Sequence, residues 1–179
     1  VRIRSLPDEF SLDNNTRDAY VEVIEGRERI LMLASAPHPD IKAIRNAIEQ
    51  NENYEFHLAI PGVSDYQPDQ YDVMILHQVP DRNRSFERIL NDLLEAGTPA
   101  FHILGSRSNL SRFNEINQSL SIRRIRNQTD QVFPAINPAF DLFTVEAATR
   151  DLISELPPIA VPFGEYTVRG NIGVMIFQQ

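Results

Sequence analysis

The chain carries short apolar runs, separated by segments in which apolar residues recur at helical spacing. Residues 30–34 read Ile-Leu-Met-Leu-Ala, and a run that is apolar on both faces is typical of a central strand in a parallel sheet. Further strands are predicted at residues 55–60, 71–76 and 99–104. Between the strands, apolar residues three and four positions apart predict amphipathic helices.

Local signals predict where these helices begin and end. Pro39 suits the first position of a helix that carries three isoleucines at helical spacing, and Asp40 suits its first turn. Ser85 is expected to cap a second helix, and Gly97 to end it in the left-handed conformation. Leu110, Phe113 and Ile116 predict a short third helix.

This alternation of strands and helices predicts an α/β fold with a mostly parallel sheet. The C-terminal third is less regular. Residues 132–143 are expected to be extended chain or loop, and Thr144 to cap a helix that stops before Pro157. Residues 166–168 and 174–177 are expected to form an antiparallel pair around two glycines.

The N-terminal residues follow a different pattern. Residues 20–24 alternate between apolar and polar side chains, which is typical of a half-buried strand. The change to a continuous apolar run predicts a module boundary near Gly26. The chain starts at Val1 and stops within an apolar run, so we interpret it as a piece of a longer protein.

Composition excludes several classes of function. The 179 residues carry a formal net charge of −8, which argues against a general nucleic-acid binder. The chain has no cysteine, so disulfides, zinc–thiolate sites and thiol catalysis are excluded. A hydrophobic content of 42% is enough for a sizeable core. The sequence shows no signal peptide and no run of about 18 apolar residues.

Polar side chains follow three of the predicted strands. In an open α/β sheet, ligands bind beyond the carboxyl ends of the strands. We therefore expect one crevice lined by His38, His77, Ser106 and Arg107. An arginine beside helix N-termini favours an anionic ligand such as a carboxylate. The alternative is that these side chains only cap helices and bond loop carbonyls.

Motifs for catalysis, metals and cofactors are incomplete. Bulky Arg107 follows Ser106 where a nucleophile elbow needs a small residue, and no histidine follows His102. No glycine-rich phosphate loop occurs, so we predict no cofactor. His38 with Asp40 supplies two metal ligands, too few to predict a metal site. His57 and His102 are expected to pack within strands. The basic cluster of Arg123, Arg124 and Arg126 is expected to be a solvated face.

Several motifs together resemble a known arrangement. They are Asp13-Asn14-Asn15, Tyr20-Val-Glu-Val-Ile, Ala36-Pro37-His38-Pro39-Asp40, Ile75-Leu76-His77, Asn137-Pro138-Ala139-Phe140 and Pro157-Pro158 with Pro162-Phe163-Gly164. The arrangement is that of large membrane-anchored bacterial proteins, especially of Bacteroidetes. In these, an immunoglobulin-like β-sandwich, often near a von Willebrand factor A domain, runs into a class I glutamine amidotransferase-like domain.

The resemblance implies a flavodoxin-like three-layer sandwich over residues 27–179, truncated at its C-terminus. It implies that residues 1–26 are the terminal strand or linker of a preceding β-sandwich. Residues 1–25 are then expected to be an extended arm outside the α/β core, disordered or paired with a neighbouring molecule. Active amidotransferases carry cysteine at the elbow, which falls at Ser106 here, and a late histidine that has no counterpart.

We therefore expect a non-catalytic interaction or ligand-binding domain of an envelope protein. The resemblance implies a membrane-anchored parent with this domain in the periplasm, and protein partners that include other domains of the parent. Contact with the membrane is expected only through parts of the parent outside this chain. The alternatives are a hydrolase-type enzyme that uses Ser106 with His38 or His77, and a structural spacer without a pocket.

Overall fold

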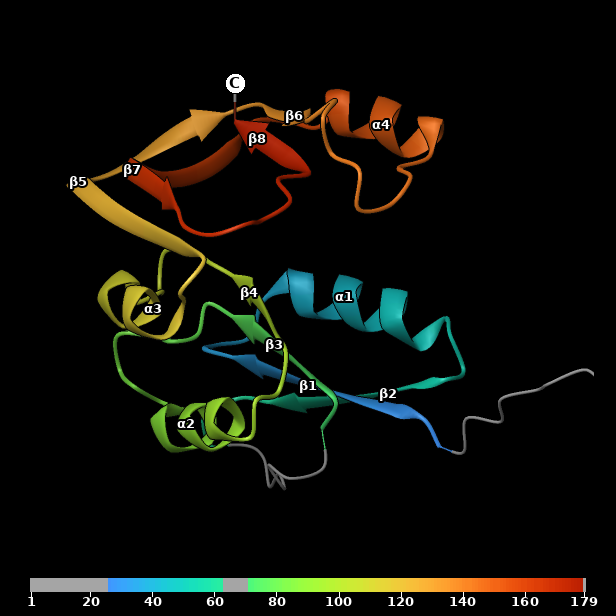
Figure 1. Cartoon of the computed structure of the whole chain (residues 1–179). Coiled ribbons are helices and arrows are strands. Elements are labelled where there is room, and N and C mark those ends of the chain that lie inside the picture. Colours follow the sequence, from blue (N-terminus) through green and yellow to red (C-terminus); the bar gives the residue numbers. More distant parts are fainter. Residues whose placement is uncertain (1–25, 63–70, 179) are drawn as a thin grey trace, which may run out of the picture.

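A four-stranded parallel sheet organises the first two thirds of the chain (Figure 1). The computed structural model describes residues 26–62 and 71–178, without the side chains of residues 126 and 127. The strands are β1 (Glu28–Ala34), β2 (Tyr54–Ala59), β3 (Val73–His77) and β4 (Ala100–Ile103), in the spatial order β2-β1-β3-β4. The predicted α/β fold with a parallel sheet is confirmed. The expected arm at residues 1–25 lies outside the described residues.

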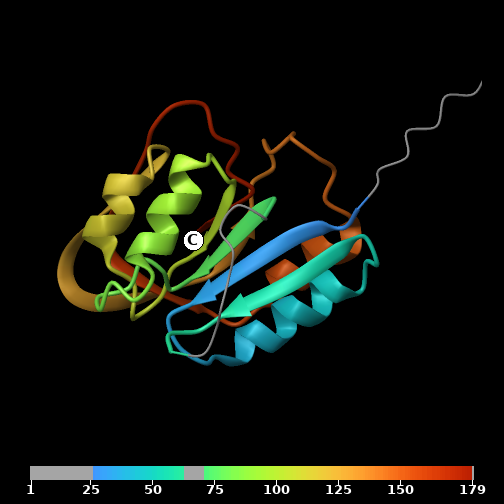
Figure 2. The ribbon, with the colours of Figure 1, turned by 90° about the horizontal axis from the view of Figure 1, so that it is seen from below.

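Helices cover both faces of this sheet (Figure 2). Along β1, Leu31 and Leu33 face α2 (Glu87–Glu95), whereas Met32 and its alternate neighbours face α1 (Pro39–Glu49). Ile116, at the end of α3 (Leu110–Ile116), packs on the same core as α2. Because both faces are covered, the central strand has no polar side, which explains its continuous apolar run.

The helix ends agree with the sequence at some positions and differ at others. Pro39 begins α1, and α3 contains Phe113 as predicted. Gly97 follows α2 with a φ of 72°, and Thr98 N–H donates to the Leu93 carbonyl, which together form a Schellman end. The predicted Ser85 cap is wrong. Phe86 is the N-cap of α2 and makes no side-chain cap bond, and both the N–H and the hydroxyl of Ser85 donate to Asp81.

The C-terminal part consists of two antiparallel strand pairs and one helix. β5 (Leu120–Val132) pairs with β7 (Ile159–Val168), β6 (Pro134–Ile136) pairs with β8 (Ile176–Gln178), and α4 (Ala147–Ser154) follows β6. The predicted pairing of residues 166–168 with 174–177 is therefore wrong. Each segment pairs with a strand far away in sequence, so the turn between them joins two different sheets.

Other expectations for this part were met at some positions and wrong at others. No strand was predicted at β5, because its charged residues hide the period-two pattern. Arg123 of the expected solvated cluster is exposed and pairs with Glu165 across the strands. The cap of α4 is Glu146 rather than Thr144, although the helix does end before Pro157. Leu152 on α4 is 60% exposed and does not reach a core.

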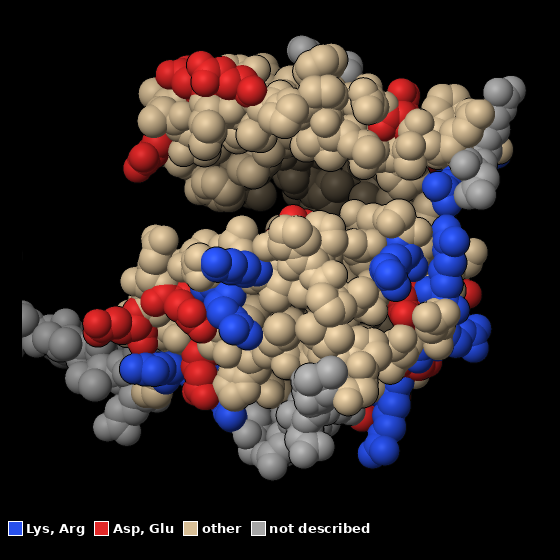
Figure 3. All heavy atoms as spheres, turned by 180° about the vertical axis from the view of Figure 1, so that it is seen from behind, with Lys and Arg blue, Asp and Glu red and all other residues tan. Residues whose placement is uncertain are grey.

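Seen from behind, the molecule is deeply hollowed between the C-terminal part and the half of the chain that contains α1 and the sheet (Figure 1, Figure 3). Acidic and basic residues are interspersed on this face, without a broad patch of one sign. Within the described ranges, no helix is long and apolar enough to span a lipid bilayer.

Candidate functional site

His77 ends β3 and stands at the switch point of the sheet. Its register partner is Ala34 at the end of β1, and the Ser35 N–H donates to the His77 carbonyl at 3.1 Å. The side chain is buried, with 1% of its surface exposed. The chain runs from β1 to β2 on one side of β1, and β3 lies on the other side, so the strand order reverses between β1 and β3. Ligands of open α/β sheets bind beyond the carboxyl ends of the strands at such a reversal, and His77 lies at this end of β3.

His38 and Asp40 reach the same point from the start of α1. His38 has an extended backbone and is the N-cap, and its Nδ1 accepts a hydrogen bond from the Asp40 N–H at 3.3 Å. Pro39 between them fixes the first helical φ, so Asp40 follows in the first turn. The sequence signal for the helix start therefore also places two functional side chains.

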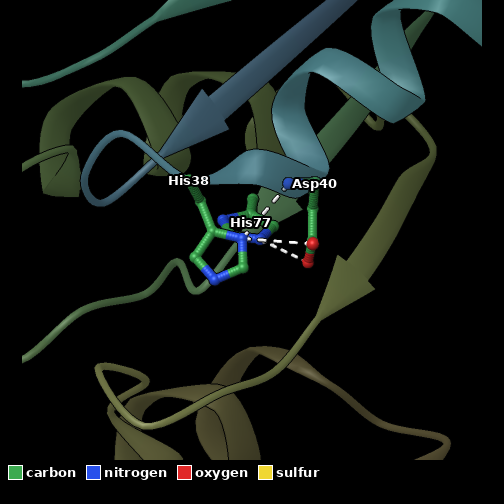
Figure 4. A group of neighbouring side chains, drawn as sticks. All are labelled: His38, Asp40 and His77. Carbon is green, nitrogen blue, oxygen red and sulfur yellow. Dashed lines mark hydrogen bonds and ion pairs between the residues drawn. The ribbon is translucent and has the colours of Figure 1, made fainter.

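The three side chains converge on one small volume (Figure 4). The Asp40 carboxylate lies 3.3 Å from His77 Nε2 through Oδ2, and 3.2 Å from His38 Nδ1 through Oδ1. The two imidazole rings are 4.8 Å apart between centroids. One ligand atom from each residue lies within 4.8 Å of the others. We call His38, Asp40 and His77 the histidine cluster.

Ser106 and Arg107 lie in a second site, next to the histidine cluster. They line a cavity of about 170 Å³ together with Asp81, Arg82 and Asn83. We call this the arginine cavity. We expected His38, His77, Ser106 and Arg107 to line one crevice. The structure places them in two groups: His38 lies beside His77, and Ser106 lines a cavity with Arg107.

The hydrogen-bonded loop after β3 connects the two places. Gln78, next to His77, has a φ of 58°, and its Oε1 accepts the Arg107 N–H at 3.0 Å. Asp81 is buried and accepts from the Ser85 N–H at 2.8 Å and from the Ser85 hydroxyl at 2.7 Å. These bonds hold Arg82 at the cavity. Sequence reasoning missed this loop, because an Asp four residues before a Ser is not by itself a signal for such a bond.

The glycine before Ser106 has a packing explanation. A Cβ at Gly105 would lie 2.7 Å from Gln78 Cδ, so glycine makes room for the Gln78 side chain. Across the described residues, no hydrogen bond links the Ser106 hydroxyl to an imidazole. This serine therefore lacks the base contact that activates a nucleophile.

The two remaining histidines lie in strands and have other roles. His57 Nε2 lies 2.7 Å from Glu55, and this hydrogen bond lowers the pKa of the Glu55 carboxyl. Burial raises the pKa of Tyr71, whose hydroxyl lies 3.4 Å from His57 Nδ1. His102 stands edge-on to Phe113 with its Nδ1 buried and unpartnered, and burial lowers its pKa. Both were expected to pack within strands, and the structure agrees.

His102 should make the protein sensitive to acid. Its pKa lies lower in the folded chain than in the unfolded chain, where it is about 6.5. Below about pH 6.5 the unfolded state therefore binds more protons, and this histidine's contribution to stability falls with pH. We expect His102→Leu to lose less stability than the wild type between about pH 7 and about pH 5 in urea unfolding. Equal losses in the two proteins would contradict this.

Comparison with known proteins gave one distant likeness. No protein-family model matches the chain, and no curated protein matches it. The structure of PurLQS from Thermotoga maritima is similar with a TM-score of 0.45 and 15% sequence identity. The likeness covers 85% of this chain and 74% of that chain.

Proposed function

We propose that the chain is a non-catalytic ligand-binding domain that takes an anionic group in the arginine cavity. The observation that carries this proposal is that Arg82 and Arg107 line one cavity together with Ser106. Both arginines are exposed, and within the described part of the chain neither is paired with a carboxylate. Guanidinium forks without a protein partner match the geometry of carboxylates and phosphates.

The size and position of the cavity fit a small anion. At about 170 Å³ it is smaller than the pockets of drug-sized ligands, so it accepts a small acid or the charged end of a larger molecule. It lies beyond the carboxyl ends of β3 and β4, where open α/β sheets bind ligands. The buried Asp81 is already bonded to Ser85, which leaves the arginines to meet the anion.

A binding role is favoured over the hydrolase alternative. That alternative needs Ser106 to transfer its proton to His38 or His77, and these imidazoles contact Asp40 instead. The absence of cysteine removes the nucleophile of class I amidotransferases. No observation therefore favours hydrolysis.

The finer assignment of the fold belongs to the same proposal. The strand order β2-β1-β3-β4 agrees with the start of the flavodoxin-like order, which supports a flavodoxin-like, amidotransferase-like domain. The sequence resemblance supports a membrane-anchored parent of the Bacteroidetes type, with this domain outside the cytoplasmic membrane. In that setting, other domains of the parent and other envelope proteins are the expected partners.

Thermal unfolding with added anions tests the binding proposal. At a concentration of one hundred times Kd, phosphate or a small carboxylate should raise the Tm by roughly 5–10 °C. Arg107→Ala and Arg82→Ala should each abolish most of this shift. Arg88→Ala is the matched control, because it removes an equal charge from an exposed helix position that does not line the cavity. Sodium chloride at equal ionic strength controls for screening.

Two outcomes would overturn the assignment. A shift that survives both Arg107→Ala and Arg82→Ala would place the ligand elsewhere. No shift with any anion would favour the protein-interaction role over small-molecule binding.

A further inference from the structure

We propose that the histidine cluster is a binding site for a divalent transition-metal ion of the zinc class. The site is separate from the arginine cavity and does not depend on anion binding. Its ligands are His38, Asp40 and His77, which come from the loop after β1, the first turn of α1 and the end of β3.

The distances within the cluster match those between ligands of one metal ion. Zinc lies about 2.1 Å from nitrogen and oxygen ligands, so neighbouring ligand atoms of a tetrahedral site are about 3.4 Å apart. The contacts of Asp40 with His38 Nδ1 at 3.2 Å and with His77 Nε2 at 3.3 Å have this length. The ligand atoms spread over as much as 4.8 Å, and Asp40 meets the two histidines through different oxygens, so metal binding must draw the two imidazoles closer together.

The protonation pattern of the cluster also favours a cation. His38 Nδ1 accepts the Asp40 N–H, so it presents a lone pair, and a carboxylate oxygen faces the same nitrogen at 3.2 Å. Two electron-rich atoms at this distance repel unless a proton or a metal ion lies between them. A metal ion bound to this lone pair replaces the hydrogen bond from the Asp40 N–H. The N–H is then hydrogen-bonded by water, as other first-turn amides of helices are.

The ligand His77 is buried, whereas the ligands His38 and Asp40 are accessible to solvent. His77 is 1% exposed, and its ring is oriented by packing and by the contact of Nε2 with Asp40, while its Nδ1 is buried without a hydrogen-bond partner. The side chains of His38 and Asp40 are 41% and 52% exposed, which leaves a path for the ion. Three protein ligands leave a further coordination position for water or an external ligand.

The ligand types select the class of metal. Two imidazoles with one carboxylate suit zinc, nickel, copper and iron, whereas magnesium and calcium prefer oxygen ligands alone. The Asp40 charge offsets the partial positive charge of the α1 N-terminus, which would otherwise oppose a cation.

Calorimetric titration of chelator-treated protein with zinc chloride tests the site. We expect one ion per chain near neutral pH and weaker binding near pH 5.5, because the imidazoles must be unprotonated to bind. His38→Asn should weaken binding at least about tenfold, and asparagine keeps the N-cap, so the fold is preserved. Cobalt should give the visible absorption of a low-symmetry site with nitrogen ligands, and magnesium should not bind.

His57→Asn is the matched control. It removes an imidazole that also contacts a carboxylate, at 2.7 Å from Glu55, but has no third ligand. Zinc affinity should be unchanged in this variant and in Arg107→Ala. Folded wild-type protein that binds no zinc would overturn the proposal, as would an equal loss of affinity in His57→Asn and His38→Asn. The anion shift, measured with a chelator present, would survive either failure.

Discussion

The Leu76→Ala substitution is expected to lower the free energy of unfolding by about 3 kcal/mol. Leu76 is the penultimate residue of β3 and is fully buried in the core between the sheet and α2. Shortening it removes apolar contacts and leaves a cavity that the neighbouring strands on both sides cannot close. Urea unfolding followed by circular dichroism, with the m-value checked against the wild type, measures the loss.

Leu152→Ala is the control for this prediction. The same atoms are removed from a side chain on α4 that is 60% exposed, and alanine favours the helix. Its free energy of unfolding should stay within about 0.5 kcal/mol of the wild type. Similar losses in the two variants would mean that Leu76 is not part of a tightly packed core.

The Gly164→Ala substitution is expected to destabilise the β5–β7 pair by about 2 kcal/mol. Gly164 is paired with Arg124, and a Cβ there would lie 3.0 Å from both the Arg123 carbonyl carbon and Arg124 Cα. These are backbone atoms, so the strands must separate to admit a methyl group. Hydrogen exchange of the β5 and β7 amides, together with urea unfolding, reports this loss locally and globally.

Glu165→Ala is the control for Gly164→Ala. A methyl group at Gly164 that pushes the strands apart could also break the neighbouring Arg123–Glu165 ion pair, and Glu165→Ala removes that ion pair alone. Glu165 and Arg123 are both exposed, so removing their ion pair should cost no more than about 1 kcal/mol. Faster amide exchange in Gly164→Ala than in Glu165→Ala is expected. Wild-type exchange rates in Gly164→Ala would show that the strands are not so close at this position.

The elements that could be predicted are those whose signals are local. The run at residues 30–34 became β1, and Pro39 and Gly97 ended up at helix boundaries, because ring geometry and a missing Cβ act within a few residues. The Ser85 cap failed because the N–H and the hydroxyl of Ser85 both donate to Asp81, four residues earlier, which ties Ser85 to the loop before the helix.

The site was predicted in part for the same reason. His38 and His77 could be placed together because parallel strands end at one edge of the sheet. Asp40 was recognised from its helical position, but its contact with His77, 37 residues away, depends on how α1 packs on the sheet. Arg82 could not be assigned, because the Asp81–Ser85 bonds that hold its loop are not a periodic signal.

By itself, the sequence determined the parallel sheet, the order of its strands and helices along the chain, and the end of the sheet where polar side chains gather. These depend on hydrophobic period and on the restricted backbones of proline and glycine, which neighbouring residues already impose. Only the tertiary structure decided the partners of β5–β8 and the division of the polar residues into the histidine cluster and the arginine cavity. Strand partners and side-chain contacts across the fold are chosen by the free energy of packing between distant segments, which no short stretch of sequence contains.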